Sequence, residues 1–468
     1  MDLSIEKMLQ SLDPHSSYIT ATDLNAANEP LEGNFEGIGV EFHIQDDTIM
    51  VVSAISGGPS EAVGIRSGDR IVKVNDTLVA GVGITNNEVM QKLRGPGGTK
   101  VRVKIYRRGA QRLMDFTITR GKIPIYSLDA SFMAAPQTGY VRISRFAATT
   151  YDEFMEACQK LSAQGMQKLI IDVRGNPGGY LDAATKIADE FISEGKSIVY
   201  TEGKSRPRAD YDATPGGKYE SLPVVIMVDE GSASASEILA GALQDWDRAT
   251  IVGRRSFGKG LVQEQTVLPD GSAIRLTIAR YYTPTGRSIQ KPYKDGFDSY
   301  NNELNERFAH SELLTIDSIK FPDSLKFTTP KGKVVYGGGG IMPDVFVPID
   351  TTDASNAFLN QVLAGGELTD FAYDFVDQNR GLLARYKDVN SFKSGFQVSD
   401  ETYQSFVKRV ASKSAVQVEP KEVAVAAPYL RNLLKANIAR QLFRGEGFYP
   451  IWLQKDPVYL KAIQVISK

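Results

Sequence analysis

Cysteine and histidine are scarce in this chain of 468 residues, which has one cysteine, Cys158, and three histidines, His15, His43 and His310. A single cysteine excludes an intrachain disulfide framework and a cysteine-rich zinc site. The histidines lie far apart in the sequence, which argues against a histidine metal cluster and against a histidine-based catalytic triad. We therefore expect no metal and no other cofactor, and any catalysis must use few imidazoles.

Long apolar segments and an excess of one charge are also absent. Apolar runs such as Leu222–Val228 fall far short of the roughly 18 residues that a membrane span needs. The first residues lack the basic and apolar regions of a secretory signal, so the chain reads as a soluble protein or as an exported protein without its leader. Lys plus Arg number 54 and Asp plus Glu 56, which gives a net charge of −2. This balance argues against a general nucleic-acid binder.

The pattern of turns and apolar residues divides the chain into four predicted segments. Residues 1–32 hold a short amphipathic helix, and residues 33–121 carry short β-branched runs between turn signals, which predict a mostly β module. Residues 122–350 alternate apolar strands with amphipathic helices, which predicts a sheet covered on both faces. Residues 351–468 are predicted to be helical. Their composition leaves open dimerisation, substrate handling or plain packing.

The α/β segment carries the motifs on which a function can be argued. Its predicted strands are 141–143, 168–173 and 223–228, its predicted helices are 151–164, 180–192 and a stretch ending near 245, and a hairpin turn is predicted at Pro269-Asp270-Gly271. Two of the predicted strands end in glycine- or serine-rich turns that open a helix. Such turns leave backbone N–H groups free to meet a negative charge.

The most informative of these turns is the sequence DEGSASASEIL at residues 229–239. It can expose a serine hydroxyl at a helix N-terminus, where N–H groups and the helix dipole favour a developing oxyanion. A serine needs a base to become a nucleophile, and the histidines offer no convincing one. A lysine can serve if burial lowers its pKa from about 10.4 to near 7 or 8.

Lys259 is the candidate base, because it lies between two glycines among apolar residues in the sequence SFGKGLV. Gln263 follows four residues later, and its amide can orient the lysine amine. A structural interpretation competes with this one. Ser234 and Glu237 fit the S-x-x-E capping box, in which the serine only caps the helix, and a lysine in a glycine-rich turn is commonly solvated. Neither motif decides between the two interpretations by itself.

Two further turns are candidate binding elements. In DVRGNPGGY, at residues 172–180, the turn after a strand is either an oxyanion-binding turn or a tight connection, and it matches neither a Walker loop nor a GxGxxG fingerprint. At the head of the β module, Gly37-Ile38-Gly39-Val40 suits a loop whose amides capture a terminal carboxylate while the adjacent strand edge pairs with peptide.

In combination, these segments resemble the C-terminal processing peptidases, also called tail-specific proteases, which are serine peptidases with a Ser–Lys dyad. The β module resembles a PDZ domain. The resemblance rests on the motifs Leu12–Tyr18, Gly37–Val40, Arg174–Gly179, Gly231–Gln244 and Gly253–Gln263, and it covers about residues 1–350. It implies a multidomain α/β fold, namely a ClpP/crotonase-like protease core with an inserted PDZ-like β module and a C-terminal helical region.

The resemblance also implies roles for individual residues. It implies that the nucleophile is Ser234, the general base Lys259 and the residue that positions the lysine Gln263. It further implies an oxyanion hole from the amide of Ala235 and one amide of the Gly178-Gly179 pair, and a peptide-binding loop at Gly37, Ile38, Gly39 and Val40. His15 becomes part of a structural motif rather than a catalytic group.

The function that the resemblance implies is a serine endopeptidase that recognises the C-terminal regions of its substrates. Its expected partners are proteins or peptides with free C-termini, with no nucleic acid and no metal, and a homodimer is left open. The expected location is periplasmic or otherwise extracytoplasmic. Arg94 either couples a bound tail to the core or is a solvated surface arginine. The rival interpretations are a non-catalytic PDZ scaffold and an acyl-transfer or lyase enzyme that acts on thioesters.

Overall fold

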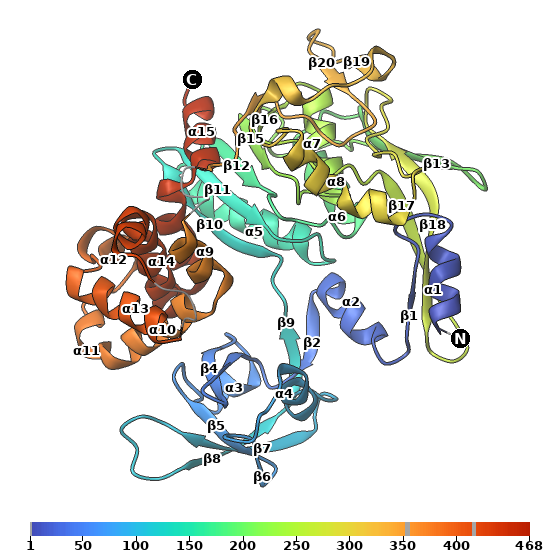
Figure 1. The fold of residues 1–468 in the computed structure, drawn as a ribbon. Helices are drawn as coiled ribbons and strands as arrows, with labels where there is room; N and C mark the ends of the chain where they lie inside the picture. Colours follow the sequence, from blue (N-terminus) through green and yellow to red (C-terminus); the bar gives the residue numbers. More distant parts are fainter. Residues whose placement is uncertain (1, 352–355, 414–417) are drawn as a thin grey trace. The chain divides into compact units, whose positions relative to one another are not determined.

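The computed structural model describes residues 2–351, 356–413 and 418–468 (Figure 1). The chain divides into two compact units, of which the first spans residues 1–33, 126–349 and 456–468 and the second spans residues 34–125 and 350–455. The four segments with boundaries after residues 32, 121 and 350 stay a prediction. The two units combine them, because the N-terminal segment belongs with the α/β core and the β module belongs with most of the helical region.

A six-stranded sheet forms the centre of the first unit. Its order is β10-β11-β12-β15-β16-β21, and β10 is antiparallel to a set of parallel strands. The strands are β10 (Leu128–Ala135), β11 (Thr138–Ile143), β12 (Lys168–Asp172), β15 (Val224–Val228), β16 (Ala249–Gly253) and β21 (Val345–Phe346). The predicted apolar runs form strands of this sheet. Their residues are apolar throughout because both faces of a parallel sheet are buried.

Helices cover both faces of this sheet (Figure 1). They are α5 (Thr150–Ala163), α6 (Leu181–Asp189), α7 (Ala235–Asp245) and α15 (Pro457–Ile466). Val141 and Ile171 pack into one large apolar core with α5, α6 and α7. Tyr140, whose side chain alternates with that of Val141, contacts Tyr459 of α15 with ring centroids 5.6 Å apart. The α/β architecture predicted from the alternating pattern is confirmed.

A second sheet in the same unit, whose strand pairs are all antiparallel, carries residues of the candidate site. It consists of β1 (Ser17–Ile19), β13 (Ser197–Gly203), β14 (Arg206–Asp212), β17 (Leu261–Val267) and β18 (Ala273–Tyr282). Strand β18 pairs with β1, β13 and β17, and the turn between β17 and β18 is the predicted Pro269-Asp270-Gly271 hairpin. The pairing aligns Gln263 with Thr277 and Gln265 with Arg275, which fixes the positions of these side chains along the sheet.

The remaining elements of the first unit surround these two sheets. They are α1 (Asp2–Gln10), α2 (Leu24–Glu32), α8 (Phe297–Ala309), η1 (Ile316–Ser318), η2 (Asp323–Leu325), β19 (Lys326–Thr328) and β20 (Val334–Tyr336). A run of four glycines at residues 337–340 follows β20. It packs against the segment before Lys259, because the Gly340 nitrogen lies against Gly258 and the amide of the next residue, Ile341, donates to Ser256 Oγ. The Gly340 amide itself donates to the Ile289 carbonyl.

The β module of the second unit is a small sheet with two helices. Its sheet has the order β3-β4-β5-β7-β8, with β6 beside β5, and a separate pair joins β2 and β9. The elements are β2 (Asn34–Gly37), β3 (Val40–Gln45), β4 (Thr48–Ala54), α3 (Pro59–Ala62), β5 (Arg70–Val74), β6 (Thr77–Leu78), α4 (Asn86–Leu93), β7 (Lys100–Tyr106), β8 (Met114–Thr119) and β9 (Gly121–Pro124). Strand β3 lies at the edge of its sheet, so one side of its backbone pairs with no other strand of that sheet.

The helical region packs around a core of its own and against the β module. Its elements are α9 (Ala357–Ala364), α10 (Glu367–Gln378), α11 (Arg380–Leu383), α12 (Val389–Gly395), α13 (Asp400–Lys413), α14 (Pro420–Trp452, with a kink at Arg444) and η3 (Leu453–Lys455). Tyr373 donates a hydrogen bond to the Val51 carbonyl at 2.5 Å, and Arg444 donates to the Ala54 carbonyl at 2.7 Å. Both acceptors belong to β4 of the β module.

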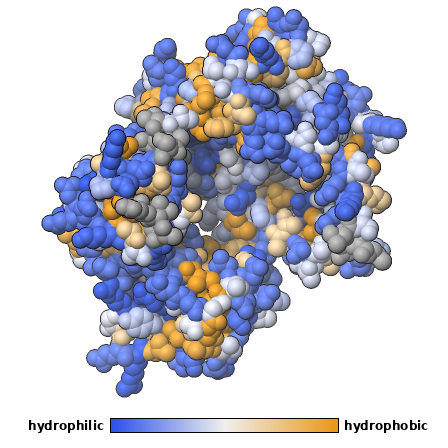
Figure 2. Space-filling model, in the orientation of Figure 1, coloured by the Kyte–Doolittle hydropathy of each residue, from blue (hydrophilic) through white to orange (hydrophobic). Residues whose placement is uncertain are grey.

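Polar and charged side chains cover most of the face drawn in Figure 2, with apolar residues in scattered patches. Among the described residues, no helix is long and apolar enough to cross a membrane. In the same part of the chain, no group of three or more histidine, cysteine, aspartate or glutamate side chains is arranged to hold a metal ion.

Candidate active site

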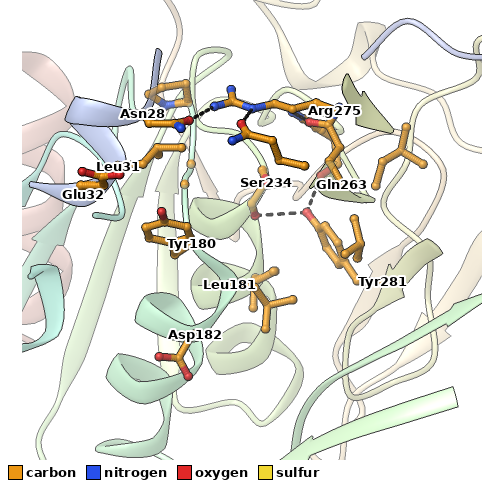
Figure 3. A pocket seen from close by; sticks show the side chains of 18 of the residues that line it. Asn28, Leu31, Glu32, Tyr180, Leu181, Asp182, Ser234, Gln263, Arg275 and Tyr281 are labelled. Carbon is orange, nitrogen blue, oxygen red and sulfur yellow. Dashed lines mark hydrogen bonds between the residues drawn. The ribbon is translucent and has the colours of Figure 1, made fainter. Parts of the chain in front are cut away.

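A cavity of about 860 Å³ in the first unit brings together five residues that the sequence singled out (Figure 3). Ser234, Lys259, Gln263, Gly178 and Gly179 all line it. They come from three separate parts of the chain, namely the turn before α7, the start of β17 with the segment that leads into it, and the turn between β12 and α6. A cavity lined by a hydroxyl, an amine and glycine amides has the groups that acyl transfer needs.

Ser234 differs in conformation and exposure from the serines on either side of it. It stands immediately before α7 with φ 56° and ψ −113°, a strained conformation for a residue with a side chain. Ser232 and Ser236 are buried, and their hydroxyls donate to the carbonyls of Val173 and Asn176 at 2.8 and 3.0 Å. Ser234 is partly exposed at the cavity, so it is the serine of this motif that a substrate can reach.

The glycine turn lies directly against the start of α7. A Cβ atom on Gly178 would come within 2.8 Å of the Ala233 oxygen and the Ser234 Cβ and within 3.0 Å of the Ala235 nitrogen. The Gly178 amide donates to Asn176 Oδ1 at 2.8 Å, which leaves the Gly179 amide as the candidate donor of the pair. Ala235 is the first residue of α7, where an amide has no acceptor within the helix.

Replacing Gly178 by alanine is expected to lower the kcat of the expected peptide cleavage by at least about 100-fold, because an added methyl group would displace the backbone of Ser234 and Ala235. Gly175→Ala is the matched control, since Gly175 is in the same turn, also has positive φ (67°) and has no atom within 4 Å of an added Cβ. Both variants carry the backbone strain of about 1–2 kcal/mol, which thermal unfolding measures. Equal kcat values for the two variants would contradict the tight packing at Gly178.

A buried carboxylate, Glu237, joins the serine and lysine segments. Its Oε2 accepts the amides of Ser234 and Lys259 at 2.8 and 2.9 Å, and its Oε1 accepts the amide of Gly258 at 2.7 Å and the hydroxyl of Ser256 at 2.5 Å. Burial raises the pKa of Glu237 to about 7, and the four donors act against that rise. In a capping box the side chain of Glu237 accepts the Ser234 amide, and this bond is present. The same carboxylate also accepts the amides of Gly258 and Lys259, so its role extends beyond capping α7.

Lys259 is partly buried, and its amine faces the amide of Gln263. Nζ donates to Gln263 Oε1 at 3.2 Å, while Gln263 Nε2 donates to the carbonyl of His15 at 2.6 Å. Burial lowers the pKa of Lys259, and the positive charge of Arg275 lowers it further. Among the described residues, the amine bonds to Gln263 and forms no direct hydrogen bond with Ser234 Oγ.

The N-terminal motif around His15 supports Gln263 from the other side. Asp13 accepts the amides of His15 and Ser16 at 2.8 and 2.9 Å and the hydroxyl of Thr277 at 2.9 Å, which fastens the motif to β18. The His15 ring contacts the Tyr300 hydroxyl at 2.7 Å. Burial, followed by the charge of Lys259, lowers the pKa of His15 to about 4, so this imidazole is neutral near pH 7.

The turn that carries Gly178 and Gly179 is anchored by buried charges. Asp172, at the end of β12, accepts hydrogen bonds from the backbone and guanidinium of Arg174 and from the Tyr140 hydroxyl. Arg174 also pairs with Asp456 at 2.9 Å, just before α15. The nearby arginine charges keep the pKa of Asp172 well below its usual range although the residue is fully buried. The turn is therefore held by the core sheet and by the C-terminal helix.

The predicted peptide-binding loop lies in the second unit, at the start of the edge strand β3. Ile38 is buried, and its carbonyl accepts the amide of Ser60 at 3.0 Å and the Ser60 hydroxyl at 2.6 Å. Gly39 has φ +73°, a conformation that favours glycine. Gly37 belongs to β2, and Val40 opens β3. Arg94 is partly exposed, and its guanidinium lies 4.7 Å from the centre of the Phe35 ring.

Sequence reasoning missed three residues of this site. The sequence indicated Glu237 only as a helix-capping residue, although its S-x-x-E spacing from Ser234 already placed it beside the candidate nucleophile. Arg275 lines the cavity and is held by Gln265 Oε1 and Asn28 Oδ1, both at 2.9 Å. Tyr281 also lines the cavity, and neither residue belongs to a motif that marks it in the sequence.

Comparison with known proteins places this site in a family. Residues 137–297 match peptidase family S41, and residues 37–118 match the PDZ domain. A carboxy-terminal-processing protease of Bartonella bacilliformis is 38% identical over 292 residues, which are 61% of this chain and 66% of the relative. Residues 37–297 therefore carry a PDZ domain and an S41 peptidase core. The predicted combination of an S41 peptidase core with a PDZ domain is thereby confirmed.

A second curated relative agrees with this assignment. The carboxy-terminal processing protease CtpB of Bacillus subtilis is 36% identical over 291 residues, which are 62% of this chain and 60% of that protein. A photosystem II D1 C-terminal processing protease of known structure is 28% identical, with 74% of this chain and 81% of that chain covered and a TM-score of 0.39. The match thus spans slightly less than two thirds of the Bartonella protease and of CtpB. Residues 358–445 match a family of unknown function.

Proposed function

We propose that the chain is a serine endopeptidase that recognises the C-terminal regions of protein substrates through its PDZ domain and cleaves peptide bonds with a Ser–Lys dyad. The observation that carries the proposal is the shared cavity of Ser234 and Lys259. The serine is held in a strained conformation at a helix N-terminus, and burial lowers the pKa of the lysine. These two properties suit an activated nucleophile and its base.

In the proposed reaction, the neutral Lys259 amine accepts the Ser234 proton while Oγ attacks the carbonyl carbon of the scissile bond. The amides of Ala235 and Gly179 then donate to the resulting oxyanion. The protonated lysine returns its proton to the leaving amine, and an acyl-enzyme remains. Water, deprotonated by the same amine, then attacks the ester. The lysine ammonium gives this proton to the departing Ser234 Oγ, which releases the new C-terminus and restores the neutral amine. Lys259 turns from Gln263 toward Ser234 when the reaction begins, because the amine must reach Oγ.

The PDZ domain supports recognition of a free C-terminus. Strand β3 is an edge strand, and the glycine-containing loop Gly37–Val40 precedes it, so an extended peptide can add to the sheet with its carboxylate at the loop. The substrate class is therefore a protein or peptide with an accessible, uncapped tail. An extracytoplasmic location stays a prediction from the family resemblance.

The proposal predicts that the full chain cleaves a disordered protein with a free C-terminus and that the same protein with an amidated C-terminus is cleaved more slowly. Ser234→Ala is expected to abolish cleavage of both substrates. Ser205→Ala is the matched control, since Ser205 is an exposed serine in the turn between β13 and β14. Mass spectrometry of the fragments over time measures all of these rates.

The outcomes separate the alternatives. Cleavage that persists in Ser234→Ala would contradict the nucleophile, and equal rates on free and amidated tails would contradict recognition of the terminal carboxylate. No cleavage by the wild type, with tail binding intact, would favour the PDZ scaffold. Turnover of an acyl thioester in place of peptides would favour an acyl-transfer enzyme.

A further inference from the structure

The distance between the two proposed reactive groups depends on contacts between separate parts of the fold. Ser234 and Lys259 are 259 − 234 = 25 residues apart, one before α7 and the other in the segment that leads into β17. These segments are not paired strands, so no ladder of backbone hydrogen bonds sets their spacing. Side chains must therefore hold the two backbones together.

Two side chains bridge the same two residues, one through their amides and one through their carbonyls. Glu237 accepts the N–H groups of both Ser234 and Lys259. On the other side, the hydroxyl of Tyr281 lies 3.1 Å from the Ser234 carbonyl (Figure 3). The same hydroxyl forms a hydrogen bond with the Lys259 carbonyl. The main chain of each proposed dyad residue is thus held at both of its polar groups.

We propose that Tyr281 is a positioning residue of the reaction, whose hydroxyl holds the main chain of Lys259 at a fixed distance from the main chain of Ser234. This inference rests on the proposed Ser–Lys mechanism and adds a residue to it. Tyr281 is not a catalytic residue in this account, since it acts on the backbone of the dyad residues and not on the substrate.

The surroundings of Tyr281 make its hydroxyl a dependable donor. The side chain is only 1% exposed and belongs to the main apolar core, and its own amide donates to the Gly260 carbonyl at 3.0 Å. Burial raises the pKa of the phenol well above its ordinary value, so the hydroxyl keeps its proton over the working pH range.

The two carbonyls depend on Tyr281 to different extents. The Ser234 carbonyl also accepts the amides of Glu237 and Ile238 at 2.8 and 2.9 Å, as the first turn of α7 requires. The Lys259 carbonyl lies outside any helix or strand, and Tyr281 is the donor that it contacts. A phenol has one proton, so the main effect of the hydroxyl is on the peptide group of Lys259.

Loss of this hydroxyl would free the Lys259 peptide on its carbonyl side while Glu237 still holds the amide. The amine would then be less tightly oriented and more open to water, which favours its protonated form. The charged and titratable groups that face Lys259 are Arg275 on β18, Glu237 on α7, and Asp13 and His15 of the N-terminal motif. All of them remain in a Tyr281→Phe variant, so a change in its pH profile would report on the hydroxyl.

The test compares the wild type, Tyr281→Phe and Tyr282→Phe as full chains on one peptide substrate from pH 6 to 10.5. Tyr282 is the matched control, because it follows on the same strand and its ring stacks on Tyr200 with centroids 4.8 Å apart. For Tyr281→Phe we expect kcat to fall about 10- to 100-fold with KM within about twofold, as for a misplaced reactive group. The rising limb of kcat/KM should also move toward higher pH by about half a unit or more.

The controls separate failure of this inference from failure of the proposed function. Cleavage by the wild type and none by Ser234→Ala establish the reaction independently of Tyr281, and a thermal unfolding curve for each variant shows that it is folded. Given those results, a Tyr281→Phe enzyme with unchanged kcat would overturn the inference. A fall in kcat with the rising limb unmoved would also overturn it, since loss of packing alone would leave the titration of Lys259 in place.

Discussion

Lys259→Met is expected to slow peptide cleavage about 10³- to 10⁴-fold in kcat, because methionine has nearly the shape of lysine but cannot accept the Ser234 proton. In the wild type, kcat/KM should rise with pH, since only the neutral amine is a base. The midpoint should lie below the ordinary lysine value of about 10.4, because burial and Arg275 lower the pKa of Lys259. The residual rate of the methionine variant should lack this rise.

Lys259→Arg and Lys160→Met complete the measurement. Arginine keeps the positive charge at all working pH values and should be as inactive as methionine, which distinguishes a need for a base from a need for a cation. Lys160 is exposed on α5 and pairs with Glu156 at 2.7 Å, so its replacement should leave kcat unchanged. Substantial cleavage by Lys259→Arg, or a pH profile that is the same in Lys259→Met, would exclude Lys259 as the base.

Glu237→Gln is the second substitution for which we expect a large effect, a loss of about 100-fold or more in kcat. Four donors meet the two oxygens of this carboxylate, and a glutamine presents an NH₂ group in place of one oxygen. At least one pair of donors would then lack its acceptor in a buried site. The cost to the free energy of unfolding should be on the order of 1–3 kcal/mol, as for a buried hydrogen-bonding group left unpaired.

The control for Glu237→Gln is Glu230→Gln, which removes the same charge from the loop before α7. Glu230 accepts hydrogen bonds from the Arg254 guanidinium at 2.8 and 3.0 Å, whereas the amides of Ser234 and Lys259 donate to Glu237, so replacing Glu230 should change kcat only slightly. Because the pair with Arg254 is largely buried, the free energy of unfolding should fall in this variant as well. Steady-state kinetics and denaturant unfolding of both variants measure the two effects. Normal kcat in Glu237→Gln would show that the reactive backbone segments keep their positions without this carboxylate.

Local patterns in the sequence predicted the elements of the peptidase core closely. The apolar run 223–228 forms β15, the amphipathic stretch 151–164 forms α5, and the predicted hairpin turn joins β17 to β18. These features depend on residues near one another in the chain, such as periodic apolar positions and a Pro-Asp-Gly turn. The resemblance added the choice of Ser234 among three serines, which local physics had left open.

The sequence alone indicated a hydroxyl before a helix, a lysine between glycines and a PDZ-like module, because each of these is written in a few consecutive residues. The tertiary structure decided how the groups meet. Tyr281 and His15 reach the reactive segments from distant parts of the chain, and Glu237 reaches the Lys259 segment from the start of α7. It also decided that the helical region packs against the PDZ module while α15 covers the core sheet. Packing of this kind depends on the shapes of whole surfaces, and no short pattern of residues records it.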